Sequence, residues 1–231
     1  MKRRRQVAAF ILSGGASSRM GRDKGLLDFG GVPLIVHSAH LIEPLVACVT
    51  VVGPPRRYAV MGLRAIADQG TAGRGSKRIR CGPLAGISTA LAATRLPWNL
   101  IVACDLPYLS RAWLEWLISR AIRSRGQVVI PRTGRGLEPL AAVYRRECGA
   151  PIAAALSRGA RKVTDVIEEL RMDVVYQREW RRLDPRALVL KNMNTPEDYA
   201  EARKWWSAER LDGDEHVDKA RQARKGSSRV L

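Results

Sequence analysis

Short runs of apolar, largely β-branched residues recur along this chain, and stretches with helical periodicity lie between several of them. Most runs are bounded by Gly, Pro or Asp, a pattern typical of buried strands. The predicted strands are Val7–Leu12, Val46–Val52, Leu100–Ala103, Val128–Ile130, Leu140–Tyr144 and Ala187–Leu190. Helices are predicted over Pro33–Leu45 and, behind a Ser110 N-cap, over Arg111–Arg125. Strands alternating with helices require crossover connections, so we expect an α/β fold, a three-layer sandwich with a mostly parallel central sheet.

A polypeptide of 231 residues suits one α/β domain. We place that domain at residues 1–206, because residues 207–231 lack apolar periodicity and mix six Lys or Arg with five Asp or Glu. This composition predicts a charged, disordered tail.

The net charge of the chain is +18, to which residues 207–231 contribute only +1 and Lys2–Arg5 contribute +4. The remaining +13 belongs to the body of the protein, so the folded surface must be basic. Such a field attracts polyanions, and charge alone does not choose among nucleic acid, acidic lipid and nucleotide phosphates.

The apolar run Val7–Leu12 follows the basic Lys2–Arg5, as in a signal peptide, but it is shorter than the apolar region of about 7 to 15 residues that a signal peptide needs. No run approaches the ~20 apolar residues of a membrane span. We therefore expect a cytoplasmic protein that does not bind a membrane. The four cysteines have no metal-ligand spacing and are expected to be reduced thiols; they are Cys48, Cys81, Cys104 and Cys148.

A glycine-rich segment, residues 12–24, follows the first predicted strand directly. Gly14 and Gly15 let backbone N–H groups approach an anion, while Arg19 and Lys24 supply fixed positive charges. The segment is neither a Walker A loop, since Arg22 follows Gly21, nor a G-x-G-x-x-G dinucleotide fingerprint. A phosphate-binding loop and a plain glycine-rich turn with solvated basic residues are the two interpretations that these residues allow.

Within that segment, Leu12-x-Gly14-Gly15-x-x-x-Arg19-Met20-Gly21-x-x-Lys24 resembles the nucleotide loop of the molybdenum cofactor guanylyltransferase family, part of the wider class of Rossmann-like nucleotidyltransferases. Four further segments match motifs of this family in the expected order. They are Gly82-Pro83-Leu84-Ala85-Gly86, Cys104-Asp105-Leu106-Pro107, Glu138-Pro139-Leu140 and Asn192-Met193-Asn194-Thr195-Pro196-Glu197. Five motifs in register, from Val7 to about Tyr199, exclude a chance match.

The resemblance implies a Rossmann-like sandwich and a Mg²⁺-dependent reaction. In this reaction the GMP part of GTP is joined to the phosphate of molybdopterin, or of Mo-molybdopterin, and pyrophosphate is released. It also implies contact with proteins that insert molybdenum or accept the finished cofactor.

Asp105 follows a predicted strand and would lie at the carboxyl edge of the sheet, where open α/β sheets bind ligands. It is either a ligand of the metal or a turn residue before Pro107. By resemblance, Asp105 and Asn194 hold the metal, although Asn194 could instead belong to a helix N-cap.

The resemblance assigns catalysis to Arg19, Lys24 and Asp105. It assigns nucleotide binding to Leu12, Ser13, Gly14, Gly15, Lys24, Asp68, Gly82 and Asp105. The chain departs from the family pattern at Ser13, where members usually have Ala, and at Gly53, where some have an Asn near the base. These departures leave the details of base recognition open.

Two other functions compete with this one. Another nucleotidyltransferase of the same fold could use CTP for the pterin, or could act on a sugar phosphate or cobinamide phosphate. A basic nucleic-acid-binding module is the rival from a different class, but the sequence has no RNP-like aromatic motif, zinc knuckle or helix-turn-helix. We therefore expect no specific binding of nucleic acid.

Overall fold

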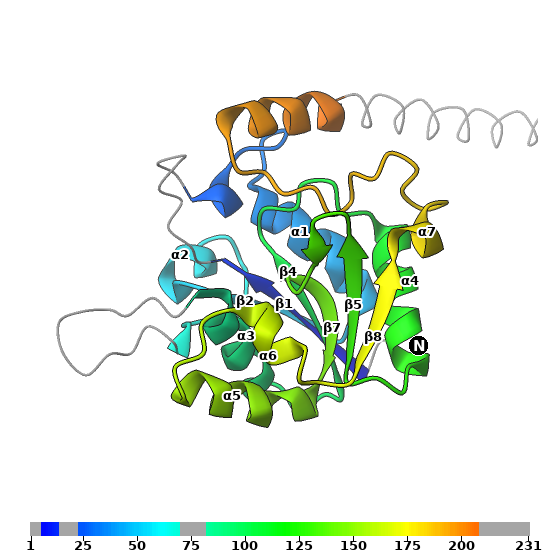
Figure 1. Ribbon diagram of the computed structural model, residues 1–231. Coiled ribbons are helices and arrows are strands. Elements are labelled where there is room, and N and C mark those ends of the chain that lie inside the picture. Colours follow the sequence, from blue (N-terminus) through cyan, green and yellow to red (C-terminus); the bar gives the residue numbers. More distant parts are fainter. Residues whose placement is uncertain (1–5, 14–22, 70–81, 208–231) are drawn as a thin grey trace, which may run out of the picture.

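The computed structural model describes residues 6–13, 23–69 and 82–207, which form a single α/β sandwich (Figure 1). Its centre is an eight-stranded sheet in the order β3-β2-β1-β4-β7-β5-β6, with β8 paired to β5. The strands are β1 (Val7–Leu12), β2 (Cys48–Val52), β3 (Ala65–Ile66), β4 (Trp98–Ala103), β5 (Val128–Thr133), β6 (Gly136–Leu137), β7 (Ala141–Arg145) and β8 (Met172–Tyr176). The order confirms the predicted α/β architecture.

Most neighbouring strands run parallel. β1 pairs in parallel with β2 and with β4, β2 with β3, and β5 with β8. β7 is antiparallel to both β4 and β5, and β6 is antiparallel to β5. The sheet is therefore mostly parallel, as expected, with one reversed strand in its middle.

Helices cover both faces of the sheet (Figure 1). The α-helices are α1 (Leu34–Ile42), α2 (Pro55–Ala59), α3 (Gly82–Ala92), α4 (Arg111–Arg123), α5 (Gly149–Ser157), α6 (Val163–Ile167) and α7 (Gln177–Trp180), and residues 196–207 are also helical. Single 3₁₀ turns occupy Lys24–Leu26, Glu43–Leu45 and Arg146–Cys148. The side chain of Ser110 caps α4 by accepting the N–H of Trp113 at 3.3 Å, which confirms the predicted helix start.

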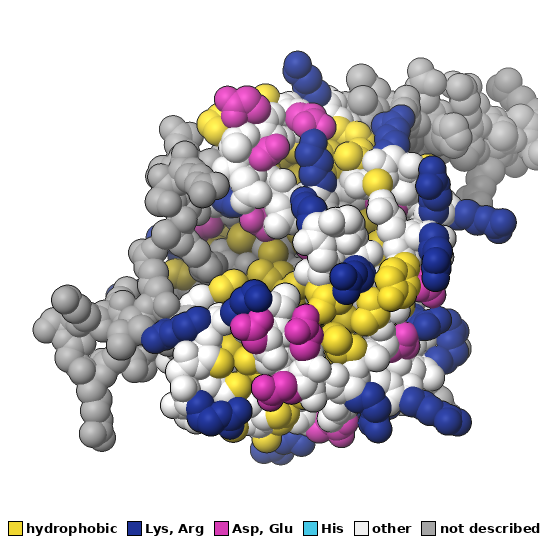
Figure 2. Space-filling model, viewed as in Figure 1, with side chains coloured by type: hydrophobic (Ala, Val, Ile, Leu, Met, Phe, Trp, Pro, Cys, Tyr) yellow, Lys and Arg dark blue, Asp and Glu magenta, His cyan; other side chains and the backbone are white. Residues whose placement is uncertain are grey.

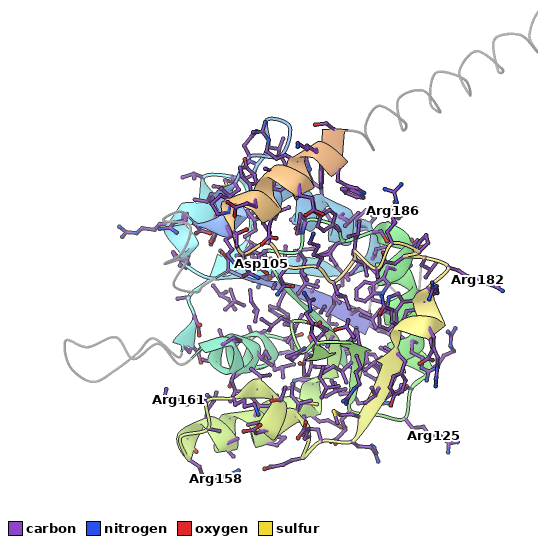
Figure 3. All side chains as sticks on the ribbon, turned by 45° about the horizontal axis from the view of Figure 1, so that its top comes forward. Asp105, Arg125, Arg158, Arg161, Arg182 and Arg186 are labelled. Carbon is purple, nitrogen blue, oxygen red and sulfur yellow. The ribbon has the colours of Figure 1, made fainter. Side chains whose placement is uncertain are left out.

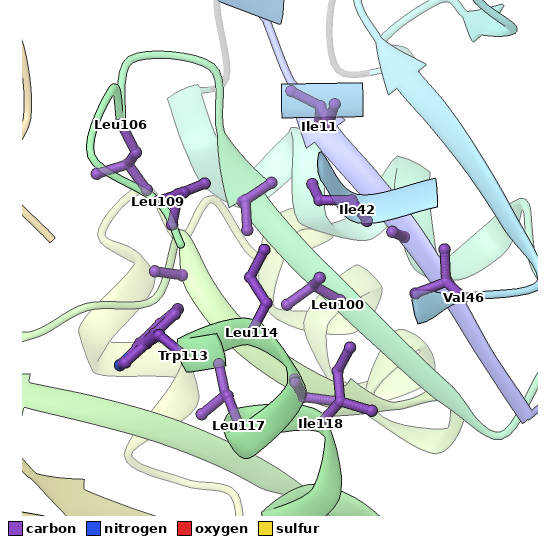
Figure 4. Close-up of a cluster of buried hydrophobic side chains, with 14 of the residues drawn as sticks. Ile11, Ile42, Val46, Leu100, Leu106, Leu109, Trp113, Leu114, Leu117 and Ile118 are labelled. Carbon is purple, nitrogen blue, oxygen red and sulfur yellow. The ribbon is translucent and has the colours of Figure 1, made fainter. Parts of the chain in front are cut away.

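Alternate residues of β1 contribute to two separate hydrophobic clusters, because successive side chains of a strand point to opposite faces of the sheet. Val7, Ala9 and Ile11 pack with α1 and α4 on one face. Ala8, Phe10 and Leu12 pack with α3, α5 and α6 on the other. Figure 4 shows part of the first cluster, in which Leu114 and Ile118 of α4 lie beside Leu100 of β4. All six residues of β1 are buried, as expected for a central parallel strand.

A third cluster lies beyond the ends of the strands, under the helix formed by residues 196–207. Its buried members are Leu27, Phe29, Leu34, Tyr108, Met193 and Ala202. Trp206 Nε1 donates to the carbonyl of Pro107 at 2.9 Å, and Tyr199 Oη donates to the carbonyl of Asp28 at 2.8 Å. The last described helix is therefore fixed above the carboxyl edge of the sheet.

The strand predicted at Ala187–Leu190 is wrong. Ala187 has a φ of 57°, and the Asp184 carboxylate accepts the N–H groups of Leu188 at 2.9 Å and Val189 at 3.1 Å, so the backbone turns there. The run is apolar because Val189 and Leu190 pack into the first cluster. Periodicity alone could not separate a buried turn from a short strand.

The sheet instead contains β8, a strand that was not predicted from the sequence. β8 pairs only with β5 among the described strands and is mostly half-buried, although four of its five residues are apolar. The two-residue β3 was missed as well.

Residues 208–231 of the predicted tail lie outside the described residues. None of the described helices is long and apolar enough to cross a bilayer.

Asp173 links β8 to α4. Its carboxylate accepts hydrogen bonds from Arg120 Nε at 3.1 Å, Arg120 Nη2 at 2.9 Å and Ser124 Oγ at 2.7 Å. Burial opposes ionisation of this carboxyl, but the bonds from Arg120 and Ser124 outweigh burial and lower its pKa. The charged form of Asp173 therefore stabilises the contact of β8 with α4.

Asp173→Asn should destabilise the protein by about 1 to 3 kcal/mol at pH 7, because it removes the charge from these hydrogen bonds. Since the pKa is lowered by folding, the contribution is complete above the unfolded pKa near ~4 and is lost as the pH falls through the folded pKa. Urea unfolding from pH 7 downward should show the difference from wild type shrinking at acid pH. Asp165→Asn, in an exposed pair with Lys162, is the control and should leave the midpoint unchanged. Equal losses from both changes would contradict this role of Asp173.

Candidate active site

The carboxyl ends of β1 and β4 lie side by side at the centre of the sheet, where Leu12 is in register with Ala103. From β1 the chain continues to β2 on one side, whereas β4 lies on the other. Strand order therefore reverses at this point, and in open α/β sheets ligands bind in the crevice outside such a reversal. The side chains that follow β1 and β4 define the candidate site.

Three polar side chains from distant parts of the chain meet at this edge. Lys24 Nζ lies 3.0 Å from Asp105 Oδ2 and donates to Asn194 Oδ1 at 2.7 Å. The side chains of Lys24 and Asp105 are each 17% exposed, so the ion pair is partly shielded from water. The structure thus brings together three residues that the sequence assigned to one site.

The backbone around Asn194 fixes its position. The N–H of Met193 donates to the carbonyl of Asp105 at 2.9 Å, which ties the segment to the turn after β4. The carboxylate of Asp198 accepts the N–H groups of Asn194 at 2.8 Å and Thr195 at 2.9 Å. The bond from Asn194 is the main reason that the pKa of Asp198 is lowered. The side chain that caps the helix of residues 196–207 is that of Thr195, which accepts the N–H of Asp198 at 3.1 Å, whereas the side chain of Asn194 is directed to Lys24.

Asp23 is the centre of a second set of contacts beside Lys24. Its carboxylate accepts the N–H of Gly25 at 3.1 Å, Arg57 Nη1 at 2.6 Å and the hydroxyl of Tyr58 at 3.1 Å. The Tyr58 hydroxyl also hydrogen-bonds Ser13 Oγ. Sequence analysis gave no role to Asp23, Arg57 or Tyr58. Asp preceding a short helix was a usable signal for a cap, whereas the contact with Tyr58 depends on the pairing of β1 with β2.

Gly53 follows β2 and lies against the end of β1. A Cβ atom there would stand 2.5 Å from the carbonyl oxygen of Ser13 and 3.0 Å from Tyr58 Cε2. No real Cβ comes that close to a backbone oxygen. The glycine that departs from the family pattern is therefore required by the close approach of the strand ends.

The other expected nucleotide-binding residues lie around the same edge. Asp68 follows β3 and accepts the hydroxyl of Thr89 in α3 at 3.2 Å. Gly82 begins α3 with a φ of +68°. Leu12 and Ser13 end β1, with the N–H of Ser13 donating to the carbonyl of Val52 at 2.9 Å. Gly14, Gly15 and Arg19 lie outside the described residues.

Cys104 precedes Asp105 and is one of three free cysteines in the described part of the chain, with Cys48 and Cys148. Burial of its sulfur and the negative charge of Asp105 raise the pKa of the Cys104 thiol to about 12. At neutral pH it stays a neutral thiol, so it is not a nucleophile for this site.

Two side-chain oxygens at this edge could hold a metal ion together with a ligand that supplies further oxygens. Within residues 6–13, 23–69 and 82–207, no three His, Cys, Asp or Glu side chains group to hold a metal. Asp105 Oδ2 and Asn194 Oδ1 nevertheless converge on one cation, the ammonium of Lys24. Two oxygen donors suit Mg²⁺, which usually completes its six ligands with substrate phosphates and water.

Many basic side chains of the described residues lie on the surface away from Asp105. Figure 2 shows Lys and Arg along the right side and lower rim of the visible face, with Asp and Glu between them. In Figure 3, Asp105 lies inward near the helix of residues 196–207. The labelled arginines project outward at the periphery; they are Arg125, Arg158, Arg161, Arg182 and Arg186. These five arginines lie away from Asp105, so they act on an anionic ligand there through a long-range field.

Residues 9–174 match the family model of the MobA-like NTP transferase domain. A molybdenum cofactor guanylyltransferase of Pseudomonas aeruginosa is 36% identical over 190 residues, which cover 81% of this chain and 89% of that protein. A probable molybdenum cofactor guanylyltransferase of Trichormus variabilis is 32% identical over 200 residues, covering 84% and 89% of the two chains.

The crystal structure of molybdopterin-guanine dinucleotide biosynthesis protein A from Archaeoglobus fulgidus has a similar fold, with a TM-score of 0.72 and 24% sequence identity. The match covers 87% of this chain and 99% of that chain. At this identity the likeness concerns the fold, and it confirms the expected Rossmann-like sandwich.

Gly53→Ala should destabilise the protein by about 1 to 3 kcal/mol, because its methyl group would push against the Ser13 carbonyl and the Tyr58 ring. Thermal unfolding measures the loss. Gly134→Ala is the control, since a Cβ at that exposed turn meets nothing within 4 Å. A Gly53 variant as stable as the Gly134 variant would mean that the strand ends separate at little cost.

Proposed function

The chain belongs to the MobA-like NTP transferase family, and on that premise we propose that it transfers the GMP part of GTP to the terminal phosphate of molybdopterin, releasing pyrophosphate. Two of the relatives that it matches over most of their length are named for guanylyl transfer to the molybdenum cofactor. The observation that carries the proposal in this molecule is the meeting of Lys24, Asp105 and Asn194 at the reversal of strand order.

In the proposed reaction, an oxygen of the pterin phosphate attacks the α-phosphorus of GTP. A P–O bond forms there, the bond to the bridging α–β oxygen breaks, and pyrophosphate leaves with the electron pair. The attacking phosphate is already ionised near neutral pH, so no strong general base is needed. The barrier lies in bringing two anions together and in stabilising the charge on the leaving group.

Lys24 is the described residue best placed to offset that charge. Its ammonium lies at the carboxyl edge between the turns that follow β4 and precede residues 196–207. A lysine is a compact charge on a flexible stem, so it can contact phosphate oxygens at the same edge. We assign a matching role to Arg19 by resemblance alone, since it lies outside the described residues.

Asp105 and Asn194 are the residues that would hold Mg²⁺. When bound, the ion would offset negative charge on the phosphate oxygens and on the leaving group. The side-chain oxygens of the two residues already converge on one positive charge, the ammonium of Lys24, and this convergence supports the assignment.

Base recognition is proposed to involve Leu12, Ser13, Asp68 and Gly82. The N–H of Ser13 is already bonded to Val52, so Ser13 can offer a nucleotide its carbonyl oxygen. Guanine presents N–H donors that such an acceptor suits.

The finished cofactor must then pass to proteins that insert molybdenum or use the product, and the chain is expected to contact them.

GTP with Mg²⁺ should raise the melting temperature more than ATP, CTP or UTP with Mg²⁺, because a ligand bound only to the native state stabilises that state. Differential scanning fluorimetry at matched nucleotide concentrations measures this order. A larger shift with CTP would assign a cytidylyltransferase instead. Equal shifts with all four nucleotides would leave only phosphate binding.

Asp105→Asn should lower kcat by about a hundredfold or more, equivalent to ~3 kcal/mol of transition-state stabilisation, and should shift the Mg²⁺ dependence to higher concentration. The measurement is a Mg²⁺ titration of pyrophosphate release from GTP plus molybdopterin, after circular dichroism has shown equal folding. Asp184→Asn is the matched control, because Asp184 only accepts backbone N–H groups in a turn. Superimposable titrations for wild type and Asp105→Asn would remove Asp105 from the site.

A further inference from the structure

Tyr58 is buried beside the site, yet it is not among the residues assigned to the reaction. Tyr58 is part of α2 and is fully buried, and its ring packs in the first hydrophobic cluster. Its hydroxyl lies between Ser13 Oγ and Asp23 Oδ2, which is 3.1 Å away. One side chain therefore joins the end of β1 to the residue that immediately precedes Lys24.

The direction of these hydrogen bonds follows from the number of protons. A tyrosine hydroxyl carries one proton, and an ionised carboxylate can only accept. Tyr58 must therefore donate to Asp23, and the hydroxyl of Ser13 donates to the oxygen of Tyr58. Burial raises the pKa of Tyr58 to about 12, so the proton is present throughout the neutral range.

Asp23 transmits this contact to the backbone at Lys24. Its second carboxylate oxygen accepts the N–H of Gly25 at 3.1 Å, which caps the 3₁₀ turn that begins at Lys24. Asp23 also binds Arg57, but the side chain of Arg57 is 48% exposed, and pairs of this kind contribute little because water screens them. The buried hydroxyl of Tyr58 is the contact to Asp23 that solvent does not weaken.

We propose that Tyr58 is a positioning residue of the transfer reaction: through Asp23 it orients the turn at Lys24, so that the Lys24 ammonium lies between Asp105 and Asn194. Tyr58 touches neither Lys24 nor, in the proposed reaction, the substrates. The role rests on the proposed function only in so far as Lys24 acts on phosphate; the placement of Lys24 itself can be measured without any nucleotide.

Tyr58→Phe tests the placement, since it removes the hydroxyl and keeps the ring. Each lysine is labelled with acetic anhydride in the nucleotide-free protein and quantified by peptide mass spectrometry. Lys24, with 17% of its side chain exposed, should react slowly in wild type and faster in Tyr58→Phe. Lys162, whose side chain is 73% exposed, is the internal reference, and the labelling rate of Lys24 in the variant should approach that of Lys162. Tyr144→Phe is the matched control, because it also deletes one hydroxyl bond of a fully buried tyrosine, to the carbonyl of Pro139. Unchanged labelling of Lys24 in a folded Tyr58→Phe protein overturns the proposal.

A double-mutant cycle on GTP affinity tests whether Tyr58 acts through Lys24. Tyr58→Phe should weaken GTP binding by about fivefold in the wild-type background and by nothing further in Lys24→Ala. Equal weakening in both backgrounds would mean that Tyr58 acts by another route and would overturn the proposal. If wild type fails to bind GTP, the proposed function fails, and the labelling result still decides the role of Tyr58.

A second variant covers the case in which Tyr58→Phe does not fold. Asp23→Asn keeps the shape of the side chain but removes the negative charge of the carboxylate that accepts the hydrogen bond from Tyr58. It should raise the labelling of Lys24 in the same direction. Wild-type labelling of Lys24 in a folded Asp23→Asn protein would overturn the proposal as well.

Discussion

The parallel pairing of β1 with β2 on one side and β4 on the other is the constraint on which the rest of the structure depends. A strand in this position has no solvent-facing side, so every residue of β1 must be apolar and must serve one of two cores. Parallel neighbours also place their carboxyl ends at one edge. The polar residues that follow these strands are therefore forced together, beyond the point where apolar packing ends.

The site at that edge is completed by a part of the chain that belongs to neither core. The helix of residues 196–207 packs on Phe29 and Tyr108 through its own aromatic side chains, with Tyr199, Trp205 and Trp206 in edge or tilted contact. This packing delivers Asn194 to Lys24, which precedes it by 170 positions. Hydrophobic burial at the third cluster thus determines a polar contact that the sheet by itself would not make.

Electrostatics in this molecule acts on two length scales. The Lys and Arg side chains of the described residues are spread over the surface, and their effect on a ligand is long-ranged and screened by salt. Near the strand ends, the Lys24–Asp105 pair and the hydroxyl chain of Ser13, Tyr58 and Asp23 are shielded from water, so their geometry is more strictly determined. A basic surface can attract two anionic substrates, whereas only the shielded groups can orient them.

The sequence by itself determined the α/β class and the central strands, and it singled out Lys24, Asp105 and Asn194, which the fold brings together. Val7–Leu12 could be recognised because burial on both faces demands an unbroken apolar run, and Ser110 because a helix start needs an acceptor for its free N–H groups. The motifs at Lys24, Asp105 and Asn194 were likewise visible as residue types at fixed places. These features are local, so neighbouring residues suffice to reveal them.

Only the tertiary structure decided which distant residues touch. The turn at 187–190 is as apolar as a strand, because Val189 and Leu190 are buried by packing into the first cluster and not by strand pairing. Gly53 is explained only by the carbonyl of Ser13, and the role inferred for Tyr58 only by the two groups that its hydroxyl joins. Contacts between the ends of neighbouring strands depend on strand order and register, and a linear pattern of residues specifies neither.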